Sequence, residues 1–335
     1  MSLRSLVFAA ALAGASLAAG NAHAQAKCDL DRPIVFAGLD YDSARFHNAV
    51  AMFILQEGYG CKVDQIPGQT IPLIAGLARG DIDVVMEIWT ANPAQPWVDA
   101  EKAGKAVSLG VNFPDAQEGW FVPRYVVEGP GAPAKDLKSV TDLKKHKALF
   151  EDPEEPGKGR FHNCIAGWQC ELINTKKLIA YGLDGDFTNF RPGSGEAVTA
   201  AVESAIARKR PIVFYYWGPT WLLGKHDLYL LEEPPFDRAT WEAMLAADRP
   251  TAATAFPVSE VIVGANAEFA KTAPTLTAFL TAYETTNKII SSALAQMRNT
   301  GASPEEAAKY FLKTREDVWL PWVAADVAER VRAKL

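Results

Sequence analysis

Three of the nine tryptophans in this 335-residue chain occupy positions from which a side chain can reach a ligand. Trp89 and Trp217 each end an apolar segment and are followed by turn residues, and Trp168 lies between two closely spaced cysteines. An indole ring has an apolar face with a negative quadrupole, which attracts cations. Large aromatic side chains more often pack in protein cores, and this alternative applies at all three positions. The positions therefore indicate either an aromatic binding site or a set of core contacts.

An alternation of strand and helix patterns must position these rings. Short apolar runs without a polar face are typical of buried parallel strands, and a 3.6-residue apolar period is typical of helices. The expected strands span residues 34–38, 62–66, 83–89, 211–217 and 256–264. The expected helices span residues 43–57 (capped by Ser43), 70–79, 196–209 (capped by Ser194) and most of the C-terminal segment. This order predicts an α/β fold with parallel sheets, in which ligands bind beyond the carboxyl ends of strands.

Length and charge limit the class of protein. The chain is 49% hydrophobic and contains 34 Lys plus Arg residues against 40 Asp plus Glu residues. Its length suits about two globular domains. Its net charge of −6 does not fit the basic surface expected of a nucleic-acid binder. Beyond residue 24, the sequence contains no apolar run of about 18 residues that would predict a membrane span.

The first 24 residues have the three parts of a secretory signal peptide. Arg4 precedes a short apolar stretch, and the segment closes with the small residues Ala22 and Ala24. A buried first helix or a membrane anchor is the alternative, but the stretch is short and rich in Ala and Gly. Cleavage would leave an exported chain that begins at Gln25, with no cysteine beside the cleavage site to carry a lipid.

Export changes how the four cysteines are interpreted. In an oxidising compartment, a small even number of cysteines favours disulfides over a zinc site or a catalytic thiol. Cys164 and Cys170 are close in sequence and would close a tight loop, which leaves Cys28 to pair with Cys61. Four cysteines allow three pairings, so the sequence leaves the other two open. A metal site is disfavoured because the Cys-x2-Cys spacing is absent.

The sequence lacks the common catalytic motifs. It contains no Gly-x-Ser-x-Gly elbow, phosphate-binding loop, dinucleotide fingerprint or His-Glu-x-x-His motif, and its five histidines have no ligand spacing. Ser194 precedes a helical stretch and fits a helix cap better than a nucleophile. A secreted hydrolase is therefore the weaker alternative, and we predict no enzyme activity, no metal and no cofactor.

Four segments together resemble the periplasmic substrate-binding proteins of ABC importers for glycine betaine, choline and related compounds. They read DIDVVMEIWT (81–90), CIAGWQC (164–170), VFYYWGPTW (213–221) and FPVS (256–259), in the order found in that family. The resemblance implies a two-lobed periplasmic binding protein of type II, with a ligand cleft between lobes joined by a strand hinge. The implied divisions are a signal peptide (1–24), the first lobe (25–125), the second lobe (126–255) and a return to the first lobe (256–335).

The same resemblance implies the site residues. The box around a quaternary ammonium would be built from Trp89, Trp168 and Trp217, with Tyr41 and Trp120 at two further positions that are aromatic in some relatives. A ligand carboxylate would be held by the backbone amides of Gln169 and Cys170. Relatives can have a histidine four residues after the first box tryptophan. This chain has Pro93 there, so Asn92 is the substitute that we expect.

Other implications concern the ligand's second end and the partners. A choline hydroxyl would need an acceptor, for which Asp40 or Asp42 could serve, although both acids also suit the start of a helix. The implied protein is a monomeric periplasmic receptor that delivers its ligand to a membrane permease and its ATPase. The same fold binding a sulfonium compound or an amino acid is the alternative.

Overall fold

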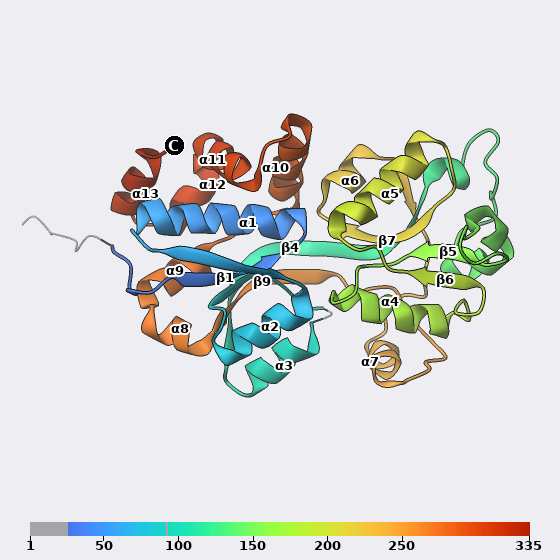
Figure 1. The fold of residues 1–335 in the computed structure, drawn as a ribbon, viewed down its shortest axis with the longest axis horizontal. Coiled ribbons are helices and arrows are strands. Elements are labelled where there is room, and N and C mark those ends of the chain that lie inside the picture. Colours follow the sequence, from blue (N-terminus) through green and yellow to red (C-terminus); the bar gives the residue numbers. More distant parts are fainter. Residues whose placement is uncertain (1–25, 92) are drawn as a thin grey trace, which may run out of the picture.

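A computed structural model describes residues 26–335 with the exception of Asn92 (Figure 1). The predicted signal peptide and Asn92 therefore lie outside the described residues. None of the helices in the described part of the chain is long and apolar enough to cross a membrane.

A sheet of five strands forms the centre of the first lobe, in the order β2-β1-β3-β9-β4. Strand β1 pairs in parallel with β2 and β3, and β9 runs antiparallel to β3 and β4. Parallel pairing places the carboxyl ends of β1, β2 and β3 at one edge of the sheet, as the α/β pattern predicts. The expectation of a parallel sheet is wrong for the strand predicted at residues 256–264, which is the antiparallel β9. The strands are β1 (Ile34–Leu39), β2 (Val63–Gly68), β3 (Val84–Trp89), β4 (Ala106–Pro123) and β9 (Ser259–Asn266).

The long strand β4 connects the two lobes. It pairs with β9 from Ala106 to Ala116, and then with β7 from Gln117 to Phe121. In the second lobe β5 lies parallel to β6 and β7, and β8 pairs with β4. One continuous strand therefore belongs to both sheets (Figure 1). The second-lobe strands are β5 (Gly159–His162), β6 (Phe187–Phe190), β7 (Val213–Gly218) and β8 (Leu228–Leu230).

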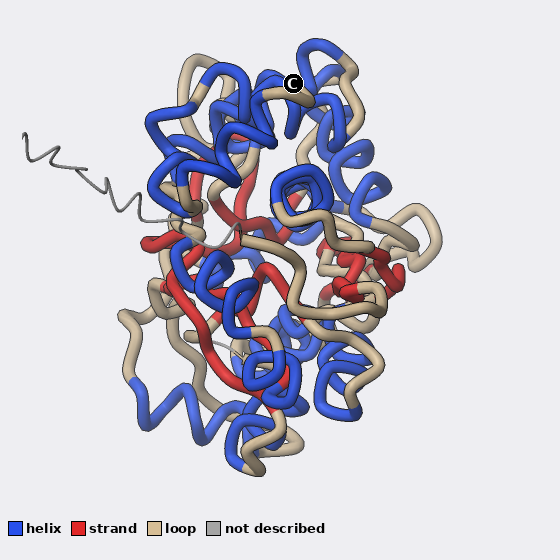
Figure 2. The backbone as a smooth tube through the Cα atoms, turned by 90° about the vertical axis from the view of Figure 1, so that its left-hand side faces the viewer, coloured by secondary structure: helices blue, strands red, loops and turns tan. Residues whose placement is uncertain are grey.

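Helices lie on both sides of the strands in each lobe (Figure 1), and Figure 2 shows the molecule from the side of the first lobe. The helices before and within the second lobe are α1 (Asp42–Phe53), α2 (Thr70–Arg79), α3 (Gln95–Lys102), α4 (Gln169–Ala180), α5 (Gly195–Ala207), α6 (Trp221–Lys225) and α7 (Arg238–Ala246). Those after β9 are α8 (Ala267–Thr272), α9 (Pro274–Ala282), α10 (Asn287–Thr300), α11 (Pro304–Thr314), α12 (Glu316–Trp319) and α13 (Ala325–Arg332). The last group packs on the first lobe, with α10 also contacting α6 of the second, so the chain returns to the first lobe after building the second (Figure 1).

Most of the predicted elements are present, and their ends differ for local reasons. Helix α2 has the predicted bounds and ends at Gly80, whose φ of 87° suits a residue without a Cβ. Ser194 caps α5 as predicted, by accepting a hydrogen bond from the Ala197 amide. Ser43 was expected to cap the first helix, which is wrong: α1 begins at Asp42, and Tyr41 is the N-cap residue. The predicted lobe divisions remain a prediction.

Both predicted disulfides are confirmed, Cys28–Cys61 and Cys164–Cys170. The first attaches the start of the described chain to the segment after α1, where the Cys28 amide also donates to the Tyr59 carbonyl. The second closes a short loop that leads into α4.

Candidate ligand-binding site

A cavity of about 60 Å³ lies between the two lobes. It is bounded by the carboxyl ends of first-lobe strands, by the start of α4 and by β7, so both lobes contribute walls. A space of this size has room for a small ligand in place of water. The lining residues are Tyr41, Thr70, Ile74, Glu87, Ile88, Trp89, Ala94, Glu118, Trp168, Gln169, Cys170, Tyr215 and Trp217.

Three aromatic rings form one continuous wall of this cavity. The ring centroids of Trp168 and Trp217 lie 5.2 Å apart, and Tyr41 lies 5.5 Å from Trp168 and 5.9 Å from Trp217. All three pairs meet edge to face, with interplanar angles of 80–83°. Edge-to-face packing stabilises such a cluster because the positive ring edge meets the negative ring face. The wall crosses the interface, since Tyr41 follows β1 whereas the two tryptophans belong to the second lobe.

The last residue of β3, Trp89, lines the cavity together with Glu87. Residues two apart on a strand project from the same face, so the pattern of β3 brings the ring and the carboxylate to one side. The Trp89 ring packs edge to face on Phe113 of β4, with centroids 6.2 Å apart. A core contact on one side therefore orients an indole that meets the cavity on the other.

Burial determines the charge state of Glu87. Its side chain is buried, and desolvation raises the pKa of its carboxyl to about 7. Polar groups of Ser43, Trp89 and Tyr41 favour the charged form, but burial outweighs them. The Nε2 atom of His47 lies 3.9 Å from the carboxylate, and burial lowers the pKa of that imidazole to about 3. A neutral His47 supplies no positive charge to offset Glu87.

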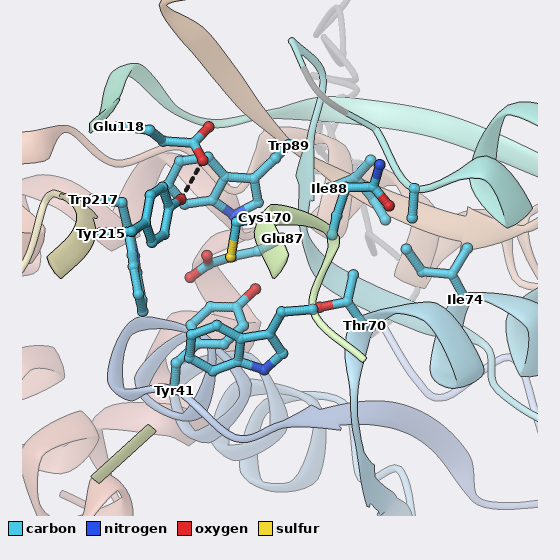
Figure 3. A pocket seen from close by; sticks show the side chains of 13 residues that line it. Tyr41, Thr70, Ile74, Glu87, Ile88, Trp89, Glu118, Cys170, Tyr215 and Trp217 are labelled. Atoms are coloured by element: carbon cyan, nitrogen blue, oxygen red, sulfur yellow. Dashed lines mark hydrogen bonds between the residues drawn. The ribbon is translucent and has the colours of Figure 1, made fainter. Parts of the chain in front are cut away.

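A second carboxylate, Glu118, reaches the cavity from β4 just beyond the point where that strand enters the second lobe. The Tyr215 hydroxyl of β7 donates a hydrogen bond to it (Figure 3). Burial and the nearby Glu118 charge raise the pKa of Tyr215 well above its ordinary range, so the phenol remains a donor. This hydrogen bond holds the Glu118 carboxylate at the cavity.

The loop closed by Cys164 and Cys170 presents Trp168 and the first turn of α4. Trp168 is the N-cap residue, and Gln169 and Cys170 are the first residues of the helix. The first N–H groups of a helix have no acceptor within that helix, and they carry the positive end of its dipole. Both residues line the cavity, so this turn offers amide donors there.

We expect the double substitution of Cys164 and Cys170 by Ser to weaken ligand affinity by more than its loss of global stability explains, because the loop would no longer be preorganised. By loop-closure entropy, opening this short loop costs about 2 kcal/mol, and opening the Cys28–Cys61 loop about 4 kcal/mol. The matched control, Ser at both Cys28 and Cys61, should therefore lose more stability and keep wild-type affinity. Titration calorimetry measures the ligand affinity of each double variant, and thermal unfolding measures its stability. Equal affinity in both folded variants would remove the preorganising role.

Hydrogen bonds between lobes surround the cavity. The Trp168 indole N–H donates to Asp40 over 2.9 Å, and the Trp221 indole N–H donates to Asp42 over 3.0 Å. A third contact joins the Ile71 amide to the Gly167 carbonyl over 3.2 Å. Both aspartates lie at the start of α1 in the first lobe, whereas the two indole donors belong to the second lobe. These bonds therefore require the lobes to be closed.

Asp42→Ala should weaken ligand binding about tenfold, although this side chain does not line the cavity. The lost bond to a charged acceptor is worth about 1.5–3 kcal/mol in the closed state alone. Trp221→Phe keeps an aromatic ring and removes the same donor, so it serves as the matched variant. A double-mutant cycle by calorimetry should show that the two effects do not add. Fully additive effects would show that the bond does not hold the closed state.

The structure does not bring every expected site residue to the cavity. Trp120 is wholly buried in the second lobe, where its ring packs 4.2 Å from Phe161 and its indole N–H donates to Asn174. This core position satisfies both the ring and its polar atom, so Trp120 does not line the site. Asp40 and Asp42 also lie outside the cavity lining and accept the interlobe bonds instead.

Sequence reasoning missed Glu87, Glu118 and Tyr215. A signal was present for two of them, since Glu87 is a charged residue inside an apolar strand and Tyr215 lies two residues before Trp217. Both therefore share a strand face with a predicted box residue. No such signal was present for Glu118, because its approach to the cavity depends on where β4 stops pairing with β9 and begins to pair with β7.

A hinged pair of α/β lobes with a ligand-sized cavity between them defines a two-lobed solute-binding protein. The chain belongs to the family described as the substrate-binding domain of ABC-type glycine betaine transport systems, whose pattern matches residues 32–314. The trimethylamine N-oxide-binding protein of Pelagibacter ubique is 24% identical over 268 residues, which cover 79% of this chain and 83% of that protein. The glycine betaine-binding periplasmic protein OusX of Dickeya dadantii is 24% identical over 204 residues, covering 59% and 60%.

Two solved structures share the fold. A choline-binding protein of an ABC transporter, in complex with choline, superposes with a TM-score of 0.73 at 18% identity, covering 92% of this chain and 98% of that one. Lactococcal OpuAC, closed on glycine betaine, superposes with a TM-score of 0.69 at 21% identity, covering 88% and 100%. The two-lobed fold predicted from the sequence is therefore confirmed.

Proposed function

We propose that this protein is the periplasmic receptor of an ABC importer and that it binds a methylated ammonium compound between its lobes. The observation that carries the proposal is the wall of three rings in edge-to-face contact, contributed by both lobes and facing a compact cavity. Trp89 and the carboxylate of Glu87 lie across the same cavity. The family supports the transport role.

The chemistry of the rings suits such a ligand. A trimethylammonium group has no N–H to donate, so ordinary acceptors cannot recognise it, whereas an aromatic face offers electrostatic and apolar contact together. Each ring contributes roughly 0.5–2 kcal/mol, so four rings supply about 2–8 kcal/mol. Micromolar binding needs about 8 kcal/mol beyond the costs of association, so the rings require further contacts. In this cavity the carboxylates and the amide donors of α4 are available for them.

Lobe closure couples binding to delivery. Because the walls come from both lobes, a ligand in the cavity contacts both and stabilises the closed state over the open one. The closed receptor would then dock on a membrane permease whose ATPase hydrolyses ATP inside the cell. Export through the predicted signal peptide would place the receptor in the periplasm.

The test is titration calorimetry of the dialysed protein with choline, trimethylamine N-oxide and glycine betaine, with ethanolamine as the unmethylated control. We expect at least one methylated compound to bind with a micromolar or lower dissociation constant, and ethanolamine to bind at least a hundredfold more weakly. Binding of none of the methylated compounds, or equal binding of ethanolamine, would overturn the proposal.

A further inference from the structure

Glu87 is a buried carboxylate aimed into the ligand cavity. It is 1% exposed, it lines the cavity, and its oxygens make no hydrogen bond of normal geometry within the described part of the chain. Figure 3 shows its carboxylate between Tyr41 and the group formed by Tyr215 and Trp217. An acid in this position is costly to ionise unless a positive charge arrives beside it. The cavity is therefore arranged for a cation.

Glu118 adds a second negative group to the same cavity. Its partner there, Tyr215, is a neutral donor (Figure 3). Lys177 is the cation that acts on Glu118 from the core of the second lobe, but its ammonium pairs with Glu233 at 2.5 Å. Among the described lining residues none is Lys, Arg or His. No described side chain of the lining therefore carries a positive charge that could form an ion pair with an anionic end of a ligand.

The positive feature that remains is the start of α4. Its first amides carry a partial charge equivalent to about half an elementary charge. The carboxylates of Glu87 and Glu118 outweigh the partial positive charge of these amides, because they repel a ligand carboxylate strongly within a desolvated site.

We infer that the native ligand is a methylated ammonium compound that carries no carboxylate. This inference rests on the proposed function and narrows it. Its cationic nitrogen lies against the ring wall within reach of Glu87 and Glu118. The two acids reject glycine betaine, whose carboxylate would be a third negative group in the same closed space. Specificity thus comes from repulsion as well as from attraction.

The first experiment compares affinities of the dialysed wild-type protein for tetramethylammonium, choline, trimethylamine N-oxide and glycine betaine at pH 8. We expect at least one of the three carboxylate-free compounds to bind at least tenfold more tightly than glycine betaine. Any smaller advantage, or tighter binding of glycine betaine, overturns the inference while leaving the proposed function intact. If none of the four binds, the proposed function fails as well.

The second experiment uses Glu87→Gln and Glu118→Gln, which keep the side-chain shape and remove one charge each. In at least one of them the preference for the best carboxylate-free compound over glycine betaine should fall at least threefold. Glu242→Gln is the matched control, because it removes a charge from an exposed position on α7. Circular dichroism and thermal unfolding establish that each variant is folded. A preference that falls less than threefold in both cavity variants overturns the role of the acids.

Discussion

Trp168→Ala and Trp217→Ala should each weaken binding of the methylated ammonium ligand at least tenfold. Each substitution removes a ring face worth roughly 0.5–2 kcal/mol to a desolvated cation. Each also removes edge-to-face support worth about 0.5–1.5 kcal/mol from the two neighbouring rings of the wall. A tenfold change needs only about 1.4 kcal/mol, so the combined loss reaches it.

The larger effect is expected for Trp168, because its indole N–H also joins the lobes through Asp40. Trp168→Phe separates these roles, since it keeps a ring and removes the donor. Trp217→Phe is the matched variant for a ring that makes no such bond in the described structure. Calorimetry with choline should place Trp217→Phe near the wild type and Trp168→Phe between the wild type and Trp168→Ala. Affinities like the wild type in both Ala variants would remove these rings from the site.

Strand-end position was an effective guide to these residues. Trp89 and Trp217 follow from a simple rule, because residues at the carboxyl end of a buried strand meet the crevice at the sheet edge. The structure places both at one cavity with Trp168 and Tyr41. The same reasoning gave the α/β fold, since the apolar runs and helical periods are local properties of the chain. Their role in binding a ligand remains a prediction.

Features that depend on distant parts of the chain could not be predicted in this way. Trp120 was expected at the site through the family resemblance alone, and Phe161 and Asn174 hold it in the core. Glu87 and Glu118 lie 31 positions apart on strands that do not pair directly, because β9 separates them. Their convergence on one cavity depends on the order of strands in the sheet, which no local pattern encodes.

The buried acid leads to a prediction about pH. Affinity for tetramethylammonium, which does not titrate, should rise about tenfold or more between pH 5 and pH 7 and level off above pH 8. In the ligand-free protein, burial raises the pKa of Glu87 to about 7, so at pH 5 the group is mostly protonated. A bound cation favours the carboxylate and lowers that pKa, so binding below pH 7 must release a proton. Each pH unit then changes affinity by at most tenfold.

Other groups near Glu87 do not account for such a profile. His47 stays neutral because burial lowers the pKa of its ring to about 3, and burial raises the pKa of Tyr41 and of Tyr215 well above the ordinary range. Burial likewise raises the pKa of Tyr283, whose hydroxyl lies 2.8 Å from His47 Nδ1. The remaining acid at the cavity is Glu118, so Glu118→Gln must keep the pH dependence if Glu87 is its source.

Glu87→Gln should remove that dependence and hold affinity near the low-pH value of the wild type at every pH. Proton release, measured by calorimetry in buffers of different ionisation enthalpy, should also disappear in this variant.

Stability provides an independent check, because a carboxyl whose pKa is raised on folding binds a proton more tightly in the native state. Between pH 4.5 and 7 the ligand-free wild type should therefore lose on the order of 3 kcal/mol relative to Glu87→Gln. A wild-type profile that is flat from pH 5 to 8 would mean that Glu87 is not the group that meets the ligand's charge.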